Sequence, residues 1–173
     1  KNMNRKHDIR NYLEIIRKLK NINPSIKFSS DFIIGYPGET DKDFNDTLSL
    51  LKEVQFINTY SFIFSSRPGT PAAQMKKVDN DICKERLINF QKLASEIKLN
   101  YRKSLFHNKS LVLFENRMNS KNKYFGRDEF ANSVIVKSEE NLEGKIKQVR
   151  ITGGNINTLF GEIDQSNNRV FAA

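Results

Sequence analysis

Asp31-Phe-Ile-Ile-Gly-Tyr-Pro-Gly-Glu-Thr40 is the stretch of sequence that decides the fold. Phe32, Ile33 and Ile34 form a continuous apolar run, which is typical of a parallel strand covered on both faces. The Gly-Tyr-Pro-Gly segment then predicts a tight loop, because Gly and Pro favour turns. Thr40 with Asp43 three residues later predicts a capped helix start. The stretch therefore predicts a strand, a loop and a helix in succession.

The residues around this stretch also form alternating predicted helices and strands. Apolar residues at helical spacing predict helices over residues 8–22 and 40–54, and a long amphipathic helix over 79–107. Strands are predicted over residues 26–35 and 57–65. An α-β-α-β order predicts parallel strands with functional residues at their C-terminal ends, and we expect the long helix to pack on the sheet as a connector.

The pattern changes after Asn108 to short strands separated by turn residues. Five are predicted, over residues 111–115, 123–127, 133–137, 145–152 and 157–163. Five short strands in so little sequence indicate a small antiparallel barrel. We therefore expect two domains, an α/β domain over residues 1–108 and a β-barrel over residues 109–173.

The composition is that of a folded protein with a polyanionic partner. Of the 173 residues, 38% are hydrophobic and 28% are charged, and the net charge is +9. Such a charge favours phosphate backbones, because Lys and Arg release their counterions. Residues 1–108 carry +7 and residues 109–173 carry +2, so RNA binding by the barrel would depend on local patches. No apolar run approaches the roughly 18–20 residues of a membrane span, and no signal peptide is recognisable, so we expect a soluble, cytoplasmic chain.

The single cysteine, Cys83, excludes an internal disulfide framework and any multi-cysteine metal site formed by this chain alone. Its helical spacing from Leu87 and Phe90 predicts an inert, partly buried thiol. His7 and His107 have no acid or nucleophile at a recognisable spacing, so neither is assigned to catalysis.

Asp31 and the loop after it form the first candidate site. A carboxylate in the middle of a strand is costly unless it meets a partner or a ligand, so Asp31 either binds a nucleoside inside a barrel or pairs with an arginine of a neighbouring strand. Gly35 and Gly38 would let the backbone approach a ligand closely. Glu39 either accepts a hydrogen bond from that ligand or complements the helix N-terminus.

Two arginines could contribute to the same site. Arg67 follows the second strand at the same end of the sheet, where its guanidinium could bind a phosphate or a carboxylate. Arg5 precedes the first helix. Each could equally be a solvated residue or a partner in a surface ion pair.

A second candidate site lies in Lys121-Asn-Lys-Tyr-Phe-Gly-Arg127. Lys121, Lys123 and Arg127 lie on either side of two aromatic residues, Tyr124 and Phe125, which is expected where bases stack and phosphates are neutralised. In the alternative interpretation the aromatic side chains, Phe125 included, face the barrel core and the cations are solvated.

Three blocks in this order resemble the radical-SAM methylthiotransferase family: Met3-Asn-Arg5, Asp31–Thr40 and Phe62-Ile-Phe-Ser-Ser-Arg-Pro-Gly-Thr-Pro-Ala-Ala73. Tyr124-Phe-Gly-Arg127 and Thr158-Leu-Phe-Gly-Glu162 are similar to the TRAM domain of that family, a small RNA-binding barrel. The resemblance implies the C-terminal portion of a partial TIM-like radical-SAM barrel, followed by an OB-like TRAM barrel.

The resemblance also implies a function. The Ser-Arg-Pro-Gly-Thr run is most similar to the tRNA enzymes of the family. Among them the best match is to those that add a 2-methylthio group to N6-isopentenyladenosine next to the anticodon. It implies S-adenosylmethionine as cofactor, held in part by Asp31, Gly35, Gly38, Glu39 and Arg5, with Arg67 at the substrate. No residue is assigned as a proton donor, because the cofactor carries the difficult chemistry.

The family also uses two [4Fe-4S] clusters, whose cysteine loop this chain lacks. The sequence is therefore expected to be a fragment, inactive without the N-terminal half, with tRNA and that half as partners and a monomeric complete enzyme. The alternatives are a free-standing RNA-binding protein, or a related methylthiotransferase acting on threonylcarbamoyl-adenosine tRNA or on a ribosomal protein.

Overall fold

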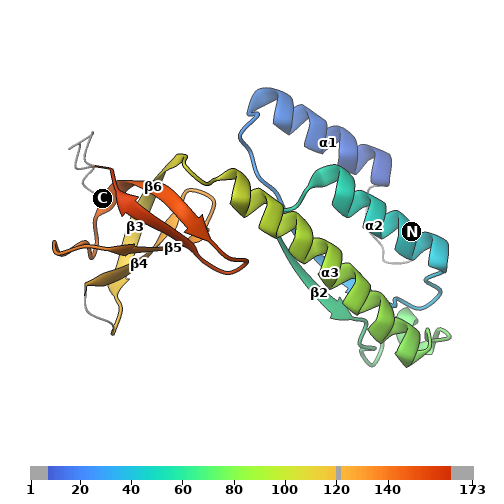
Figure 1. Ribbon diagram of the computed structural model, residues 1–173. Helices are drawn as coiled ribbons and strands as arrows, with labels where there is room; N and C mark the ends of the chain where they lie inside the picture. The colour runs from blue at the N-terminus through green and yellow to red at the C-terminus, as the bar shows by residue number, and fades with distance from the viewer. Residues whose placement is uncertain (1–7, 120–121, 165–173) are drawn as a thin grey trace. The chain divides into compact units, whose positions relative to one another are not determined.

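The computed structural model describes residues 8–119 and 122–164 and divides into two compact units, Lys1–Ile97 and Lys98–Ala173 (Figure 1). The division falls inside helix α3 (Asn80–Ser104), whereas the change in sequence pattern predicts a boundary at Asn108. The difference arises because the end of α3 and the residues after it pack with the barrel: Asn132 Nδ2 donates to the Tyr101 hydroxyl at 3.2 Å, and Leu105 and Phe106 contact the barrel core.

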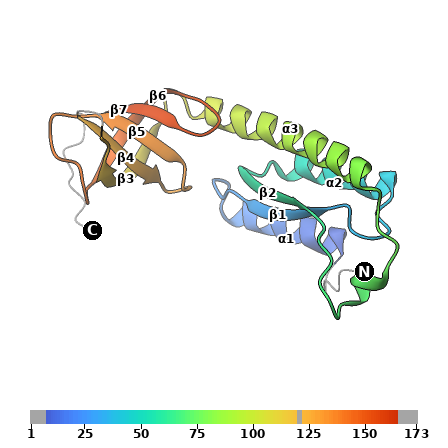
Figure 2. The same cartoon turned by 90° about the horizontal axis from the view of Figure 1, so that it is seen from below.

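The first unit is an α/β structure. It contains α1 (Ile9–Ile22), β1 (Ser29–Ile34), α2 (Asp41–Val54), β2 (Asn58–Ile63), a short 3₁₀ helix η1 (Pro71–Gln74) and most of α3. The strands pair in parallel, with Ser29 opposite Asn58 and Ile34 opposite Ile63, and they lie side by side in Figure 2. The predicted α-β-α-β order and parallel pairing are confirmed.

The core of this unit lies on one face of the two-stranded sheet. Phe32 and Ile34 of β1 point into it, together with helix residues such as Leu51 and Phe90, which are fully buried. Ser29, Asp31 and Ile33 alternate with them and are exposed. Among residues 8–119, the helices pack against only one face of the sheet, so the expectation that both faces of the strand are covered is wrong for this part of the chain.

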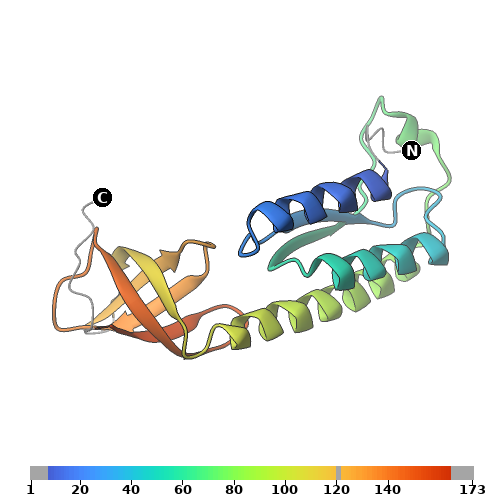
Figure 3. The ribbon, with the colours of Figure 1, turned by 90° about the horizontal axis from the view of Figure 1, so that it is seen from above.

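The second unit contains a closed five-stranded barrel (Figure 3). Its strands are β3 (Lys109–Arg117), β4 (Lys123–Asp128), β5 (Ser133–Lys137), β6 (Ile146–Gly154) and β7 (Leu159–Ile163), in the order β3-β4-β5-β7-β6. All five predicted strands are present. The prediction of a fully antiparallel barrel is wrong at one pair, since β5 and β7 run parallel. A closed ring with an odd number of strands requires at least one such pair, and five strands closed in this way fit an OB-like barrel.

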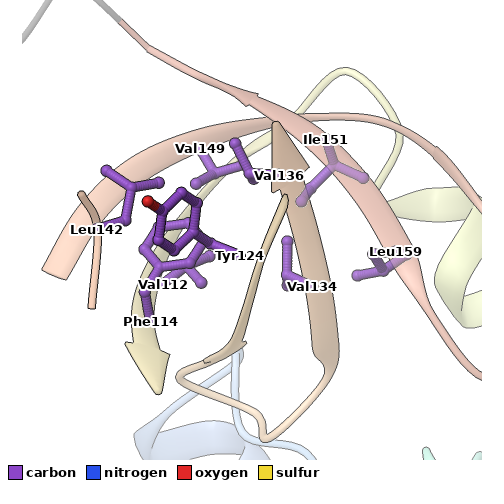
Figure 4. Packing of buried hydrophobic residues seen from close by; sticks show 9 residues of the cluster. All are labelled: Val112, Phe114, Tyr124, Val134, Val136, Leu142, Val149, Ile151 and Leu159. Atoms are coloured by element: carbon purple, nitrogen blue, oxygen red, sulfur yellow. The ribbon is translucent and has the colours of Figure 1, made fainter. Parts of the chain in front are cut away.

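Alternate residues of these strands, together with Leu142 from the segment between β5 and β6, fill the barrel (Figure 4). The buried cluster comprises Val112, Phe114, Tyr124, Val134, Val136, Leu142, Val149, Ile151 and Leu159. Tyr124 is therefore a core residue, and its neighbour Phe125 points to the outer surface. Strand alternation explains both placements.

The long helix α3 ends at Ser104, three residues before the predicted end at His107. His107 has a φ of 68°, outside the helical region, and its N–H donates to Ile151 O of the barrel. Over the described residues, no helix is both long and apolar enough to span a bilayer.

Candidate functional site

The first feature of the site is the face of the β1–β2 sheet that points away from the core. We call it the uncovered face, and it carries Asp31, Ile33, Tyr60 and Phe62. Asp31 lies directly opposite Tyr60, and Ile33 lies opposite Phe62. Ile33 is 43% exposed, Tyr60 is 64% exposed and Phe62 is 60% exposed. A carboxylate beside two exposed aromatic rings provides hydrogen-bond acceptors next to an apolar surface, a combination that suits a nucleoside. β2 carries no arginine that could pair with Asp31.

A cavity of about 410 Å³ lies at the C-terminal end of this face. Its lining is formed by Ile33, Phe62, Ile63, Phe64, Ser65, Arg67, Thr70 and Ala72. The volume is in the range of small-molecule sites, and Arg67 is the one charged side chain of the described lining. The cavity can therefore hold an apolar or aromatic group with an anionic group close to Arg67.

Glu39 determines the shape of the loop after β1. Its Oε2 accepts a hydrogen bond from the Gly35 N–H at 3.0 Å, and its Oε1 accepts from Arg86 Nη1 at 2.8 Å. The Glu39 side chain is only 11% exposed. Its two oxygens are thus engaged in holding the start of the loop to helix α3.

Arg86 is a residue that sequence reasoning missed. It is 7% exposed and also donates to Asp41 Oδ1 at 2.6 Å. Burial by itself lowers the pKa of Arg86, but the hydrogen bonds with Asp41 and Glu39 outweigh burial and raise it. A signal was present in the sequence, because Arg86 lies at helical spacing from Cys83 and Phe90, within an otherwise apolar stripe.

The backbone conformation and the packing around position 35 both require glycine there. Its φ of 74° is left-handed, and a Cβ at this position would clash with Cys83 Sγ. Cys83 is 3% exposed, and burial raises the pKa of its thiol. The expectation of an inert thiol is consistent with this burial, and the sulfur atom packs against the loop.

The structure brings some of the predicted residues together and separates others. Arg67 lines the cavity with Ile33, and Asp31 lies two residues before Ile33 on the same face. Gly38, with a φ of 86°, and Glu39 belong to the loop and not to the cavity lining. Arg5 lies outside the described residues.

Sequence reasoning also missed the two aromatic residues on the uncovered face. Tyr60 and Phe62 alternate with half-buried Ser61 and Ile63 along β2. Period-two alternation would have placed them on one face, but only the pairing register shows that this face is shared with Asp31.

The second candidate site lies on the outside of the barrel. Lys123, Phe125 and Arg127 alternate along β4 on its outer surface. The Arg127 guanidinium lies 5.5 Å from the centre of the Phe125 ring, and Arg127 Nε donates to Glu115 Oε1 at 3.0 Å. Lys121 lies outside the described residues.

Within residues 8–119 and 122–164, no group of three or more His, Cys, Asp or Glu side chains could hold a metal ion.

The chain is similar to known proteins over nearly its whole length. The model of the radical SAM superfamily matches residues 1–51, which include β1 and its loop. A tRNA-2-methylthio-N(6)-dimethylallyladenosine synthase of Pelagibacter ubique is 46% identical over 98% of this chain and 38% of the relative. Proteins of the same name from Wolbachia pipientis and Rickettsia conorii are 40% identical over 92% and 94% of the chain, and the chain covers 37% of each.

The resemblance to the radical-SAM methylthiotransferases is therefore confirmed. The chain spans a little over a third of the length of the curated relatives that it matches. The similarity covers both units, since it extends over nearly all of the chain.

Proposed function

We propose that this chain, a homologue of the tRNA-2-methylthio-N(6)-dimethylallyladenosine synthases over nearly its whole length, forms the C-terminal part of such an enzyme. The complete enzyme would add a 2-methylthio group to N6-isopentenyladenosine next to the tRNA anticodon. The observation that carries this proposal is the 46% identity over 98% of the chain. The shared name of the relatives favours this substrate over threonylcarbamoyl-adenosine tRNA or a ribosomal protein.

The α/β unit would supply the last two strands of a partial radical-SAM barrel. In such a barrel the helices lie outside and the opposite face of the sheet lines the interior, where the functional groups gather at the C-terminal ends of the strands. The uncovered face with Asp31, Tyr60 and Phe62 would then be interior surface, closed by strands from the rest of the enzyme. This assignment explains why large apolar side chains are exposed there.

S-adenosylmethionine fits the chemistry of this face. Asp31 offers a carboxylate that can accept hydrogen bonds from ribose hydroxyl or amino groups, and the cavity offers apolar walls with Arg67 for a carboxylate. Gly35 and Gly38 would bring backbone close to the cofactor, and Glu39 would hold that loop in place through Gly35 and Arg86. When bound with a cluster, the cofactor supplies the radical chemistry.

The two [4Fe-4S] clusters do not fit the residues of this chain, which has one cysteine, buried against Gly35. They would belong to the remaining part of the enzyme, and the proposed roles of this chain are binding and positioning. The barrel would bind tRNA as a TRAM domain through Lys123, Phe125 and Arg127.

The affinity of the complete enzyme for S-adenosylmethionine tests the role of Asp31. We expect Asp31→Ala to weaken binding at least about tenfold, since a lost hydrogen bond to a charged group costs about 1.5–3 kcal/mol. Asp46→Ala is the matched control, because Asp46 is an exposed carboxylate that pairs with Lys42 on α2. Equal affinities for Asp31→Ala and the parent enzyme would remove Asp31 from the site.

A free-standing RNA-binding protein is the second candidate, favoured by the closed barrel with its own core. The two candidates differ in the α/β unit. In an RNA-binding protein without methylthiotransferase activity, Asp31→Ala would leave every measurable property except stability unchanged.

A further inference from the structure

The cavity near Arg67 has an aromatic wall. Phe62 and Phe64 lie two positions apart, so both side chains point to the uncovered face, where Phe62 lies opposite Ile33. The Phe64 N–H donates to Ile34 O at 2.8 Å, which continues the pairing of the two strands. The Phe64 ring also contacts the Tyr36 ring of the loop after β1, with the ring centres 5.2 Å apart and an angle of 71° between the rings. This wall is therefore held both by the sheet and by the loop.

The segment after β2 forms the other wall of the cavity. The Thr70 N–H donates to Arg67 O at 3.2 Å, and the Thr70 hydroxyl donates to the same oxygen at 2.8 Å. Ala72 follows in η1, is 8% exposed and has the smallest side chain of the described lining. A larger residue at this position would therefore extend into the cavity.

Phe62, Phe64 and Ala72 form a part of the cavity that we call the apolar subsite. Arg67 is the one charged side chain of the described lining, and Asp31 lies outside that lining. The proposed contacts of S-adenosylmethionine with Asp31 and Arg67 therefore do not use the apolar subsite for any polar group. A polar group placed there would lose its hydrogen bonds with water and gain none, so the apolar subsite favours a hydrocarbon group.

We propose that the apolar subsite binds the dimethylallyl group of the substrate adenosine, and that Phe64 and Ala72 determine the specificity for this group. The inference rests on the proposed function, which supplies the N6-dimethylallyladenosine substrate. The dimethylallyl group is a branched hydrocarbon, so its burial between apolar walls favours binding. A threonylcarbamoyl group would instead bring amide groups and a carboxylate, which the apolar subsite cannot pair.

The first experiment fills the apolar subsite. Fluorescence anisotropy would measure the affinity of the complete enzyme for two labelled anticodon stem-loop RNAs, one with N6-dimethylallyladenosine and one with adenosine at the same position. We expect the parent enzyme to bind the modified RNA at least about tenfold more tightly, since each buried carbon adds to the affinity. Ala72→Leu should abolish this preference and leave the affinity for the unmodified RNA unchanged.

Ala73→Leu is the matched control. Ala73 is the next residue of η1 and is not part of the described cavity lining. The same increase in side-chain size should therefore leave the preference for the modified RNA as it is in the parent enzyme. Loss of the preference in both variants would overturn the proposal, because a disturbance of η1 would then account for the effect.

The second experiment removes the aromatic wall. Phe64→Ala deletes apolar surface without blocking the cavity, so we expect the preference for the modified RNA to fall about fivefold or more. A preference that survives in both Phe64→Ala and Ala72→Leu would overturn the proposal.

The affinity for S-adenosylmethionine separates the substrate from the cofactor. Isothermal titration calorimetry of the complete enzyme should give the same Kd for Ala72→Leu and the parent. A higher Kd in Ala72→Leu would overturn the proposal, because the cofactor would then fill the apolar subsite.

A third stem-loop RNA, with threonylcarbamoyl-adenosine, tests the chemical class of the bound group. The parent enzyme should bind it no more tightly than the unmodified RNA, and binding as tight as that of the dimethylallyl RNA would overturn the proposal. Failure of the proposed function has a different sign, which is the persistence of 2-methylthio nucleosides in cells that lack the complete gene. A preference that survives in both cavity variants, while those nucleosides are lost from such cells, would contradict the apolar subsite alone.

Discussion

At the scale of single residues, Gly35 allows the most specific prediction. Alanine at this position must adopt a left-handed conformation, which costs about 1–2 kcal/mol, and must also displace Cys83, at an overpacking cost of about 1–3 kcal/mol. We expect Gly35→Ala to lower the free energy of unfolding by the sum of both effects, measured by urea denaturation.

Gly69 supplies the control, because it has a φ of 80° but no atom within 4 Å of an added Cβ. Gly69→Ala should therefore show the conformational cost alone. Equal losses for the two variants would show that Cys83 does not restrict Gly35.

Arg86 should contribute more to the stability of the fold than an arginine in an exposed ion pair. Its side chain is 8% exposed and that of Glu39 is 11% exposed, so Arg86→Ala would leave a carboxylate largely buried without its cation. We expect a loss of about 3–5 kcal/mol. Arg17→Ala, which removes a pair with exposed Glu53, should cost at most about 1 kcal/mol. Thermal unfolding of both variants measures the difference. Similar Tm values would contradict the conclusion that the ion pair of Arg86 with Glu39 holds the loop after β1 to helix α3.

At the scale of elements, the start of α2 should show a defined pH dependence. Thr40 Oγ1 accepts from the Asp43 N–H at 3.2 Å, and Thr40 donates to the Asp43 carboxylate. The hydrogen bonds from Thr40 lower the pKa of Asp43 below its ordinary value of 3.8. The carboxylate is thus favoured in the folded state, so its contribution is present above pH 3.8 and is lost as the pH falls through the folded-state pKa.

Thr40→Ala should destabilise the chain by about 1 kcal/mol at neutral pH, the usual cost of losing a cap. The difference from the parent chain should shrink as the pH falls below the ordinary pKa of Asp43. Thr47→Ala, a change in the middle of α2, should give a difference that does not depend on pH. Denaturant titrations between neutral pH and pH 3 measure both. A Thr40→Ala difference that stays constant over this range would contradict the capping box.

The helices and strands were the part of the structure that the sequence predicted best. Periodicity located the helices and strands, and Thr40 with Asp43 predicted the capping box that the structure contains. Periodicity could not give the pairing of β5 with β7, because the order of strands in a closed barrel depends on contacts distant in sequence. The same limit applies to Glu39 and Arg86, which are 47 positions apart and meet only through the fold.

At the scale of the whole chain, the two units have separate cores and are proposed to have separate roles. The α/β unit presents Asp31 and the cavity near Arg67, and the barrel presents Lys123, Phe125 and Arg127 on its outer surface. The motifs in the sequence indicated both regions, because Asp31–Thr40 and Lys121–Arg127 are short and distinctive. Tyr60 and Phe62 were not indicated as site residues, because their significance depends on which residues lie opposite them.

The central proposal is that this chain is part of an enzyme that methylthiolates tRNA. The most direct measurement is mass spectrometry of nucleosides from the bulk tRNA of cells that lack the complete gene. The account predicts that 2-methylthio-N6-isopentenyladenosine disappears, that N6-isopentenyladenosine accumulates in its place, and that the intact gene restores the methylthio group. Unchanged levels of the 2-methylthio nucleoside in the deletion strain would contradict it.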